Sequence, residues 1–283
     1  ERVCVGAEPI RADTLARFVE RFAPCGLRRD AIYPCYGLAE ATLFVAGGSS
    51  DDGFTTGTFD TAALEAGRVV PASDEPSRTI VAAGREWPEQ RVVIVNPETG
   101  RRCEPDDVGE IWVSGPNVAH GYWERPDESM ATFDARLPDM SDVTWLRTGD
   151  LGFLYQEALY IAGRLKDLVI IAGRNHHPAD VEITVESAHA AIRAGGAAAF
   201  AIETSGTEAL VVVAEIERTW RRADVDEGSR AIARAVAERH DLVPQAVAVV
   251  RPASLPRTSS GKIQRHLCRA NYLSGMLAMW DDR

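Results

Sequence analysis

One short stretch of the 283-residue sequence, "YGLAE", combines residue types that could act on a charged ligand. It places the ring of Tyr36, the backbone of Gly37 and the carboxylate of Glu40 within five residues. An aromatic ring can stack on a base, glycine lets the backbone approach a ligand, and a carboxylate oxygen suits Mg²⁺ beside a phosphate. Taken alone, the stretch is interpreted more simply as a core tyrosine and a capping glutamate.

Three further stretches carry charges in turns. In "LRTGDLGF" the carboxylate of Asp150 could accept both hydroxyls of a ribose, or it could bond its own backbone. "GRLKDL" gathers Arg164, Lys166 and Asp167, which could also be a solvated hairpin with paired charges. In "LPRTSSGKIQRHL" the ammonium of Lys262 suits a carboxylate or phosphate oxygen, although an exposed lysine near a helix N-terminus is the alternative.

Composition excludes several other classes of protein. Lys and Arg total 31 against 42 Asp and Glu, and the net charge of −11 argues against nucleic acid or an anionic membrane as the main partner. No apolar run is long enough to span a bilayer, and no signal peptide is present, so no integral membrane association is expected. The five cysteines form no C-x-x-C pair, which fits a reducing, cytoplasmic location. No histidines are paired at i, i+4, so a zinc site is not expected.

The elements expected in the first part of the chain alternate strands with short helices. Strands are expected over 2–9, 91–103 and 109–115, the last half-buried, together with a strand, a turn and a short helix over 31–44. A helix over 12–24 places Leu15, Phe18, Val19 and Phe22 on one face and ends at Pro24 and Gly26. Residues 49–90 are polar and loop-like, with a possible strand over 78–84.

The second part predicts a small α+β domain. Strand, polar corner, strand and helix follow residue 165, with Pro178 and Asp180 in the first turn of that helix. Strands over 197–203, 208–217 and 246–250, a helix over 227–240 and a terminal helix complete it. We place the boundary at Lys166–Asp167 and assign 1–165 to an α/β domain and 166–283 to the α+β domain. The chain begins at Glu1 within a strand-like pattern, and we interpret it as a piece of a longer protein.

The order of the motifs is more specific than any one of them. "VGAEP", "YGLAE", "GEIWVSGPNVAHGYW", "LRTGD", "GRLKDLVIIAGRN" and "PRTSSGK" follow one another as in the adenylate-forming superfamily of acyl-CoA synthetases, nonribosomal adenylation domains and luciferases. The resemblance extends from Gly6 to about Ser274. "CYGLAEATLFVAGG", "GRNHHPADVE" and an insertion at about 49–90 resemble the fatty acyl-AMP ligases in particular. The resemblance implies that 1–165 is the end of a large N-terminal domain and that 166–283 is a small mobile C-terminal lid.

The resemblance implies a reaction in which a long-chain fatty acid and ATP, with Mg²⁺, give an acyl-adenylate and pyrophosphate. The acyl group would then pass to the phosphopantetheine arm of an acyl carrier protein in polyketide- or lipopeptide-type lipid biosynthesis. The implied roles are adenine packing by Gly6, Ala7 and Glu8, stacking by Tyr36 beside Gly37, Mg²⁺ binding by Glu40, ribose binding by Asp150 and Arg164, a hinge at Lys166, and catalysis by Lys262.

The sequence also departs from the family's pattern. The phosphate-binding loop and most of the acyl pocket are missing, so the isolated fragment is expected not to complete adenylation. "LYQEALY" lacks the glycine expected where its hairpin reverses, and His120 and His177 receive no role. A long-chain acyl-CoA synthetase is the alternative, since only the insertion is thought to disfavour transfer to CoA. A carrier-protein-docking module without chemistry is a second alternative, although the retention of Lys262 and the acidic motif residues argues against it.

Overall fold

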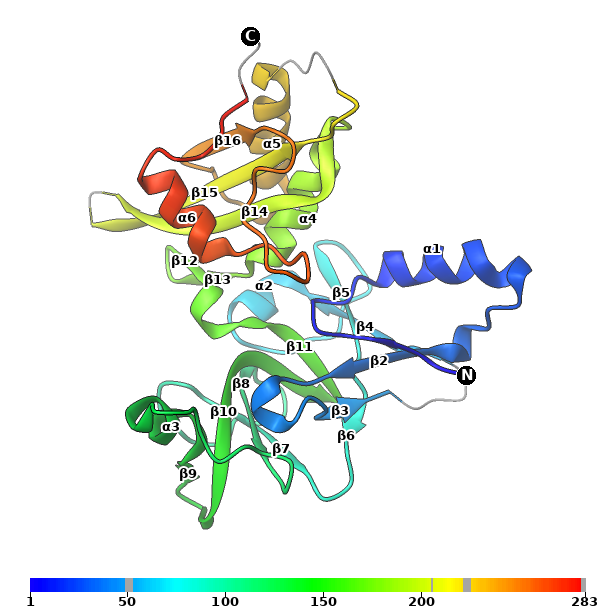
Figure 1. The fold of residues 1–283 in the computed structure, drawn as a ribbon, viewed down its shortest axis with the longest axis vertical. Helices are drawn as coiled ribbons and strands as arrows, with labels where there is room; N and C mark the ends of the chain where they lie inside the picture. The colour runs from blue at the N-terminus through cyan, green and yellow to red at the C-terminus, as the bar shows by residue number, and fades with distance from the viewer. Residues whose placement is uncertain (49–52, 205, 221–224, 281–283) are drawn as a thin grey trace. The chain divides into compact units, whose positions relative to one another are not determined.

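The computed structural model describes residues 1–48, 53–204, 206–220 and 225–280, and the chain divides into two compact units (Figure 1). The first unit is Glu1–Lys166 and the second is Asp167–Arg283. The start of the expected insertion, residues 49–52, lies outside the described residues. No helix in the described ranges is both long and apolar enough to cross a membrane.

The first sheet of unit 1 has the order β1-β2-β3-β6. Its strands are β1 (Val3–Val5), β2 (Ile32–Tyr36), β3 (Ala46–Gly47) and β6 (Arg85–Glu86). β1 and β2 are parallel, with Val5 opposite Pro34, whereas β3 runs antiparallel to both of its neighbours. Because parallel neighbours end at the same edge of a sheet, the residues after β1 and after β2 lie beside each other.

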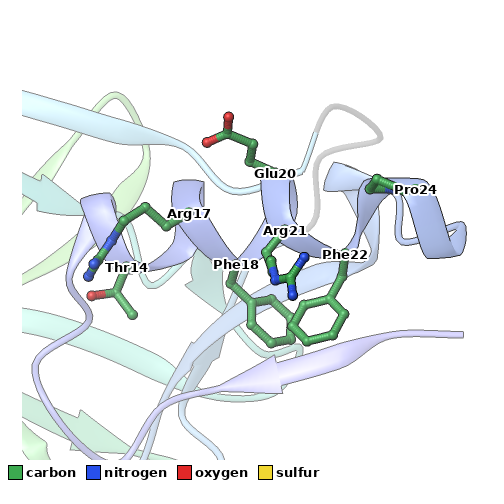
Figure 2. A pocket seen from close by; sticks show the side chains of 7 residues that line it. All are labelled: Thr14, Arg17, Phe18, Glu20, Arg21, Phe22 and Pro24. Carbon is green, nitrogen blue, oxygen red and sulfur yellow. The ribbon is translucent and has the colours of Figure 1, made fainter.

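Helix α1 (Ala12–Phe22) connects the two parallel strands. Leu15 is buried against Ile32, as the expected apolar face requires. The same face is only half covered, because Phe18 and Phe22 remain 41% and 43% exposed, with ring centroids 4.8 Å apart. Figure 2 shows both rings beside Arg21, where they line a shallow pocket. The helix ends at Phe22, and a 3₁₀ turn through Pro24 closes at Gly26 with φ +89°, as predicted.

A second sheet supplies the central strands of unit 1, in the order β11-β10-β8-β7, with β9 pairing β10. Its strands are β7 (Arg91–Val95), β8 (Gly109–Ser114), β9 (Ala135–Leu137), β10 (Met140–Tyr155) and β11 (Ala158–Arg164), and Phe133 of α3 (Pro126–Phe133) packs against it. The expectation of a half-buried β8 is wrong. Ile111 and Val113 pack into one core and Trp112 into another, so the strand is covered on both faces.

The segment over 53–90 has more regular structure than its composition suggests. It forms β4 (Thr56–Asp60), α2 (Thr61–Glu65) and β5 (Ser77–Val81), and β4 pairs antiparallel with β5. The expected strand over 78–84 is confirmed as β5, whereas the loop-like interpretation of 56–65 is wrong. Phe59 explains the difference: its fully buried ring packs edge-on against Phe153, Tyr155 and Tyr160 of β10 and β11, at centroid distances of 4.9–5.4 Å.

Unit 2 contains the elements that the periodicity predicts. After a 3₁₀ turn at Leu165–Asp167 come β12 (Val169–Ile171), β13 (Arg174–His176), α4 (Pro178–Ala188), β14 (Ile192–Thr204), β15 (Thr207–Ile216), α5 (Val225–His240), β16 (Ala246–Val250) and α6 (Arg265–Leu273). β14, β15 and β16 form one sheet. Ala197 and Ala199 of β14 pack with α4 and α5, whereas Ala198 and Phe200 pack with α6. The two helical layers therefore cover opposite faces of the sheet.

Candidate functional site

Tyr36 and Asp150 meet in unit 1, although 114 residues separate them in the sequence. Tyr36 is the last residue of β2, and its hydroxyl donates a hydrogen bond of 2.8 Å to Oδ2 of Asp150. Burial, and then the negative charge of Asp150, raise the pKa of the Tyr36 hydroxyl well above its usual range. The hydroxyl therefore stays protonated near neutral pH and acts as a donor.

Arg164 completes this group from the neighbouring strand. It lies opposite Asp150 in the pairing of β10 with β11, and its Nε donates a hydrogen bond of 2.9 Å to Oδ1 of Asp150. The side chain of Asp150 is 15% exposed and that of Arg164 is 47% exposed. Each carboxylate oxygen can accept more than one hydrogen bond, so Asp150 can still accept donors from a ligand such as the two hydroxyls of a ribose. The orientation of Asp150 is therefore set before a ligand binds.

A bulge in β10 presents Asp150 at this position. Arg147 lies opposite Trp112 of β8, and Leu151 lies opposite Glu110, so β10 contains two more residues than β8 between these pairs. Gly149 adopts φ +70°, a left-handed conformation that favours glycine. The motif "RTGD" is therefore a bulge whose shape depends on its glycine.

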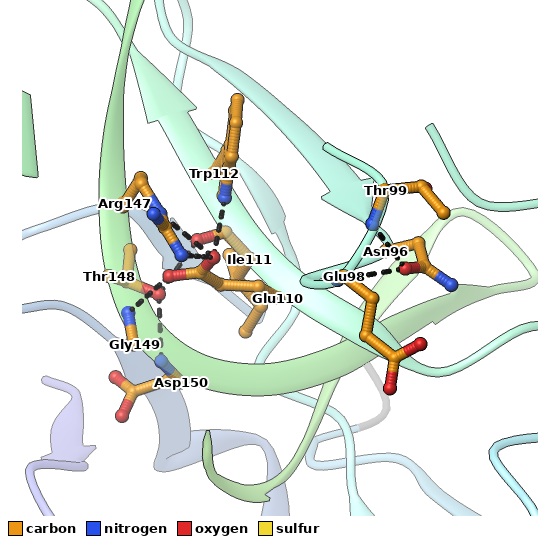
Figure 3. A network of polar contacts seen from close by, with 10 residues as sticks. All are labelled: Asn96, Glu98, Thr99, Glu110, Ile111, Trp112, Arg147, Thr148, Gly149 and Asp150. Carbon is orange, nitrogen blue, oxygen red and sulfur yellow. Dashed lines mark hydrogen bonds and ion pairs between the residues drawn. The ribbon is translucent and has the colours of Figure 1, made fainter. Parts of the chain in front are cut away.

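The carboxylate of Glu110 holds the bulge in place, and Figure 3 shows its contacts with Gly149, Trp112 and Arg147. Its Oε1 accepts a hydrogen bond of 3.1 Å from the backbone N–H of Gly149. Its Oε2 accepts bonds from Nε1 of Trp112 at 2.9 Å and from Nε and Nη2 of Arg147 at 3.1 and 3.0 Å. Glu110 is only 2% exposed, and every one of these partners is a donor. A buried carboxylate needs such donors, and here they fix the turn before Asp150.

Thr148 adds a second support. Its hydroxyl donates a hydrogen bond of 2.7 Å to the carbonyl of Ile111 and accepts one of 3.1 Å from the backbone N–H of Asp150. Sequence reasoning identified Asp150 and missed both Thr148 and Glu110. The available signal was the single acidic residue inside the apolar strand "GEIWVSG", because a buried carboxylate must have partners.

The loops after β1 and β2 lie at one sheet edge, as the parallel pairing requires. Gly6, Ala7 and Glu8 follow β1, and Gly37 follows β2. A Cβ at Gly37 would lie 1.4 Å from the carbonyl oxygen of Leu43, and a Cβ at Gly6 would lie 2.6 Å from that of Cys35. The glycines are thus needed for backbone packing, which is a different reason from the ligand approach suggested by the sequence. The side chain of Glu8 is exposed.

Glu40 lies in the 3₁₀ turn Ala39–Ala41, and Tyr122 orients it. The Tyr122 hydroxyl donates a hydrogen bond of 2.7 Å to Oε1 of Glu40. Burial, and then the bond to Glu40, raise the pKa of Tyr122 to about 12. The described residues contain no cluster of three or more histidine, cysteine or acidic side chains able to hold a metal. A single carboxylate fits Mg²⁺, which often binds one or two carboxylates and completes its shell with phosphates and waters.

Lys262 lies in unit 2, at the end of a tight turn rather than a loose one. The N–H of Thr258 donates to the carbonyl of Lys262 at 2.8 Å, and the N–H of Gly261 donates to the carbonyl of Thr258 at 2.9 Å. Arg257 donates to the carbonyls of Gly261 at 3.0 Å and Gly195 at 2.6 Å, which attaches the turn to β14. Within the described ranges, no hydrogen bond or ion pair involves the Nζ of Lys262.

The remaining predicted residues are placed as follows. Lys166 is the last residue of unit 1, and its side chain is exposed. His120 is exposed, whereas His177 is buried at the start of α4. Tyr36, Asp150 and Arg164 form one connected group, and Glu40 is held separately by Tyr122.

Comparisons with known proteins match both units of the chain. A family model described as AMP-binding enzyme matches residues 1–123, and a model described as Disco-interacting protein 2-like, AMP domain, matches residues 166–281. JamA, a medium-chain-fatty-acid–[acyl-carrier-protein] ligase of Moorena producens, is 45% identical over 283 residues, which cover 98% of this chain and 48% of JamA. FadD32, a long-chain-fatty-acid–AMP ligase of Mycolicibacterium smegmatis, is 40% identical over 304 residues, which cover 96% of this chain and 48% of FadD32.

The fold is similar to that of a solved relative. A structure from a study of fatty acyl-adenylate ligases from E. coli and L. pneumophila has a TM-score of 0.82 and 31% identity, covering 97% of this chain and 47% of that one. The chain thus spans about half the length of the proteins it matches. FadD21 of Mycobacterium tuberculosis, 40% identical over 94% of this chain and 47% of FadD21, is named a putative fatty-acid–CoA ligase. With two matching family models and relatives at 40–45% identity, the chain belongs to the adenylate-forming enzymes, and fatty acyl-AMP ligases are among its relatives.

Proposed function

We propose that the full-length protein carrying this chain is a fatty acyl-AMP ligase. It joins a fatty acid of medium or long chain to the AMP part of ATP, releases pyrophosphate, and passes the acyl group to the phosphopantetheine arm of an acyl carrier protein. The observation that carries the proposal is the connected group of Tyr36, Asp150 and Arg164, which leaves a partly buried, oriented carboxylate able to accept hydroxyls. The names of JamA and FadD32 supply the substrate class.

In the proposed reaction, Asp150 accepts hydrogen bonds from the ribose hydroxyls, with Arg164 holding its carboxylate. Gly6, Ala7, Glu8 and Tyr36 with Gly37 line the adenine at the common edge of β1 and β2. Mg²⁺ at Glu40 would neutralise charge on the triphosphate. These residues position the α-phosphorus for attack by a carboxylate.

Lys262 has the catalytic role in the proposal. A fatty acid oxygen attacks the α-phosphorus, the new P–O bond forms, and pyrophosphate leaves with the electrons of the bond that breaks. The two reacting groups are both anionic, so the ammonium of Lys262 offsets their repulsion and holds the attacking oxygen in line. The turn at Thr258–Gly261 gives this ammonium a defined base. Lys166 serves as the hinge between the two units.

In this proposal CoA does not accept the acyl group, because the insertion disfavours the arrangement needed for transfer to CoA. Strand β4 of the insertion is anchored to the rest of unit 1 through Phe59, which packs on the hairpin of β10 and β11 that ends at Arg164. This anchoring supports a bracing role for the segment. An acyl-CoA synthetase, the second candidate, would give acyl-CoA in the same assay. The isolated chain lacks the phosphate loop and is proposed to be inactive by itself.

The test uses the full-length protein with fatty acids of several chain lengths, ATP and Mg²⁺, and then CoA or a phosphopantetheinylated carrier protein. Mass spectrometry should detect acyl-AMP and acyl-carrier without acyl-CoA. Lys262→Ala should lower the adenylation rate about 10²–10³-fold, which is typical for one transition-state contact. Arg234→Ala, at an exposed arginine on α5, is the control and should leave the rate unchanged. Abundant acyl-CoA would assign the protein to the synthetases, and no adenylate at any chain length would refute both candidates.

A further inference from the structure

Arg265, the first residue of α6, joins three elements of unit 2. Its Nε and Nη2 donate to the two oxygens of Glu182 at 2.6 and 2.7 Å, and its Nη1 donates to Oδ2 of Asp167 at 3.1 Å. Glu182 belongs to α4 and also accepts the backbone N–H of Ala199 in β14 at 3.0 Å. One guanidinium therefore connects α4 and, through it, β14 to the segment that begins unit 2.

The contact with Glu182 has the geometry of a strong pair. Two parallel N–H···O bonds between a guanidinium and a carboxylate fix the plane of both groups. The side chain of Glu182 is 9% exposed and that of Arg265 is 26% exposed. Burial alone would lower the pKa of Arg265, but its bonds to Glu182 and Asp167 outweigh burial and raise that pKa. Arg265 therefore stays charged, and its third donor remains directed at Asp167.

The network connects the boundary between the units, at Asp167, with the segment that carries Lys262. Asp167 is the first residue of unit 2, directly after the boundary at Lys166. Arg265 comes three residues after Lys262 in the sequence, and the intervening backbone is paired. Ile263 bridges Arg257, and the N–H of Gln264 donates to the carbonyl of Pro256 at 3.0 Å. A displacement of Arg265 is thus transmitted to the turn through hydrogen-bonded backbone and not through a flexible linker.

We propose that Arg265 is a positioning residue that couples Asp167, at the boundary between the units, to the turn that carries Lys262. The proposal deepens the function proposed above and rests on it for the role of Lys262. Glu182 holds the guanidinium of Arg265 in place, and Asp167 is the partner whose position changes. When the backbone changes direction at Lys166–Asp167, the orientation of Asp167 changes the position of Arg265, and with it the lysine turn. Placement of the catalytic ammonium is then linked to the orientation of unit 2.

The chain offers a matched pair of substitutions for the test. Asp167→Asn weakens one bond from Nη1 of Arg265 at 3.1 Å, and Asp241→Asn weakens one bond from Nη1 of Arg174 at the same distance. Both changes have the same chemistry, and asparagine tolerates the positive φ of 55° at Asp241. Hydrogen–deuterium exchange of the full-length protein is measured for both variants. Asp167→Asn should raise exchange severalfold in peptides over 257–264, whereas Asp241→Asn should leave these peptides unchanged.

The activity arm separates positioning from stability. Asp167→Asn should lower kcat for adenylation about tenfold without changing the KM for ATP, because small misplacements of a catalytic group cost rate. In a Lys262→Ala background the same substitution should cost nothing further, since the group it positions is gone. Arg265→Lys should behave like Asp167→Asn in both arms, because one ammonium cannot reproduce the three-bond geometry.

Two results would overturn the proposal. One is an exchange increase in Asp167→Asn confined to residues 165–170, which would make the contact purely local. The other is an equal loss of kcat from Asp167→Asn with and without Lys262. If the wild-type protein forms no adenylate, the proposed function fails, but the exchange arm still decides whether Asp167 and the lysine turn are coupled.

Discussion

Replacement of Glu110 by Gln tests whether the buried carboxylate positions Asp150. All four groups that contact Glu110 are donors: the N–H of Gly149, Nε1 of Trp112 and two nitrogens of Arg147. An amide has one oxygen and one NH₂ group. Whichever way the amide of Gln lies, its NH₂ group faces a donor. The better orientation keeps the three bonds to Trp112 and Arg147 and opposes the N–H of Gly149.

The expected cost follows from these contacts. A hydrogen bond to a charged acceptor contributes about 1.5–3 kcal/mol, and the pairing with Arg147, which is 39% exposed, adds about 0.5–1 kcal/mol. Glu110→Gln should therefore lower the free energy of unfolding by about 2–4 kcal/mol. For a unit of 166 residues this corresponds to a Tm lower by about 10 °C. Because the lost bond is the one that holds Gly149, the KM for ATP should also rise about tenfold.

The control separates loss of stability from loss of position. Val113→Ala, on the same strand, removes two methyl groups from a fully buried side chain and should cost about 2–3 kcal/mol. The side chain of Val113 takes no part in the hydrogen bonds by which Thr148 and Glu110 hold the bulge. The KM for ATP of Val113→Ala should therefore stay at the wild-type value. Thermal unfolding and initial rates of pyrophosphate release measure both quantities. An ATP KM in Glu110→Gln equal to that of Val113→Ala would refute the reasoning.

Three further predictions follow from local features. Gln156 and Glu157 occupy a two-residue hairpin turn with φ 49° and 63°, so replacing them by Asn-Gly should raise the free energy of unfolding by about 1 kcal/mol in chemical denaturation. Burial raises the pKa of the Cys103 and Cys268 thiols to about 11, so stability should fall as pH rises from about 9 to 11, because the unfolded chain releases these protons first; a pH-independent Tm in that range would contradict this. Gly37→Ala would place a Cβ 1.4 Å from a carbonyl oxygen and should abolish the yield of folded protein, as judged by gel filtration.

The elements of unit 2 could be predicted because their sequence patterns are strong and local. β15 and β16 consist of apolar runs flanked by polar residues, and α5 repeats apolar residues at helical spacing. In unit 1 the same reasoning failed at β8, where Glu110 suggested an exposed face. Periodicity cannot distinguish a solvated acid from a buried acid surrounded by donors, because most of the donors, from Arg147 and Gly149, come from another strand.

The candidate site could be predicted only as a set of separate motifs. The bond between Tyr36 and Asp150 spans 114 residues, and no spacing rule predicts such a contact. Family resemblance implied roles for both residues at one nucleotide, and for the catalytic and hinge lysines, but it did not predict this bond. The coupling through Arg265 was outside the reach of both methods, since its partners Glu182 and Asp167 lie 83 and 98 residues away. Roles in catalysis remain predictions until the variants are measured.

The ring of Phe59 changes how the segment over 56–81 can be studied. Three aromatic side chains, Phe153, Tyr155 and Tyr160, surround that ring in unit 1. Aromatic side chains bury about 150–250 Å² each, so deleting the segment would expose an apolar surface of several hundred square ångströms to water. A truncated protein would then aggregate for reasons unrelated to acceptor choice. Chimeras between relatives with and without the segment must exchange all four rings together.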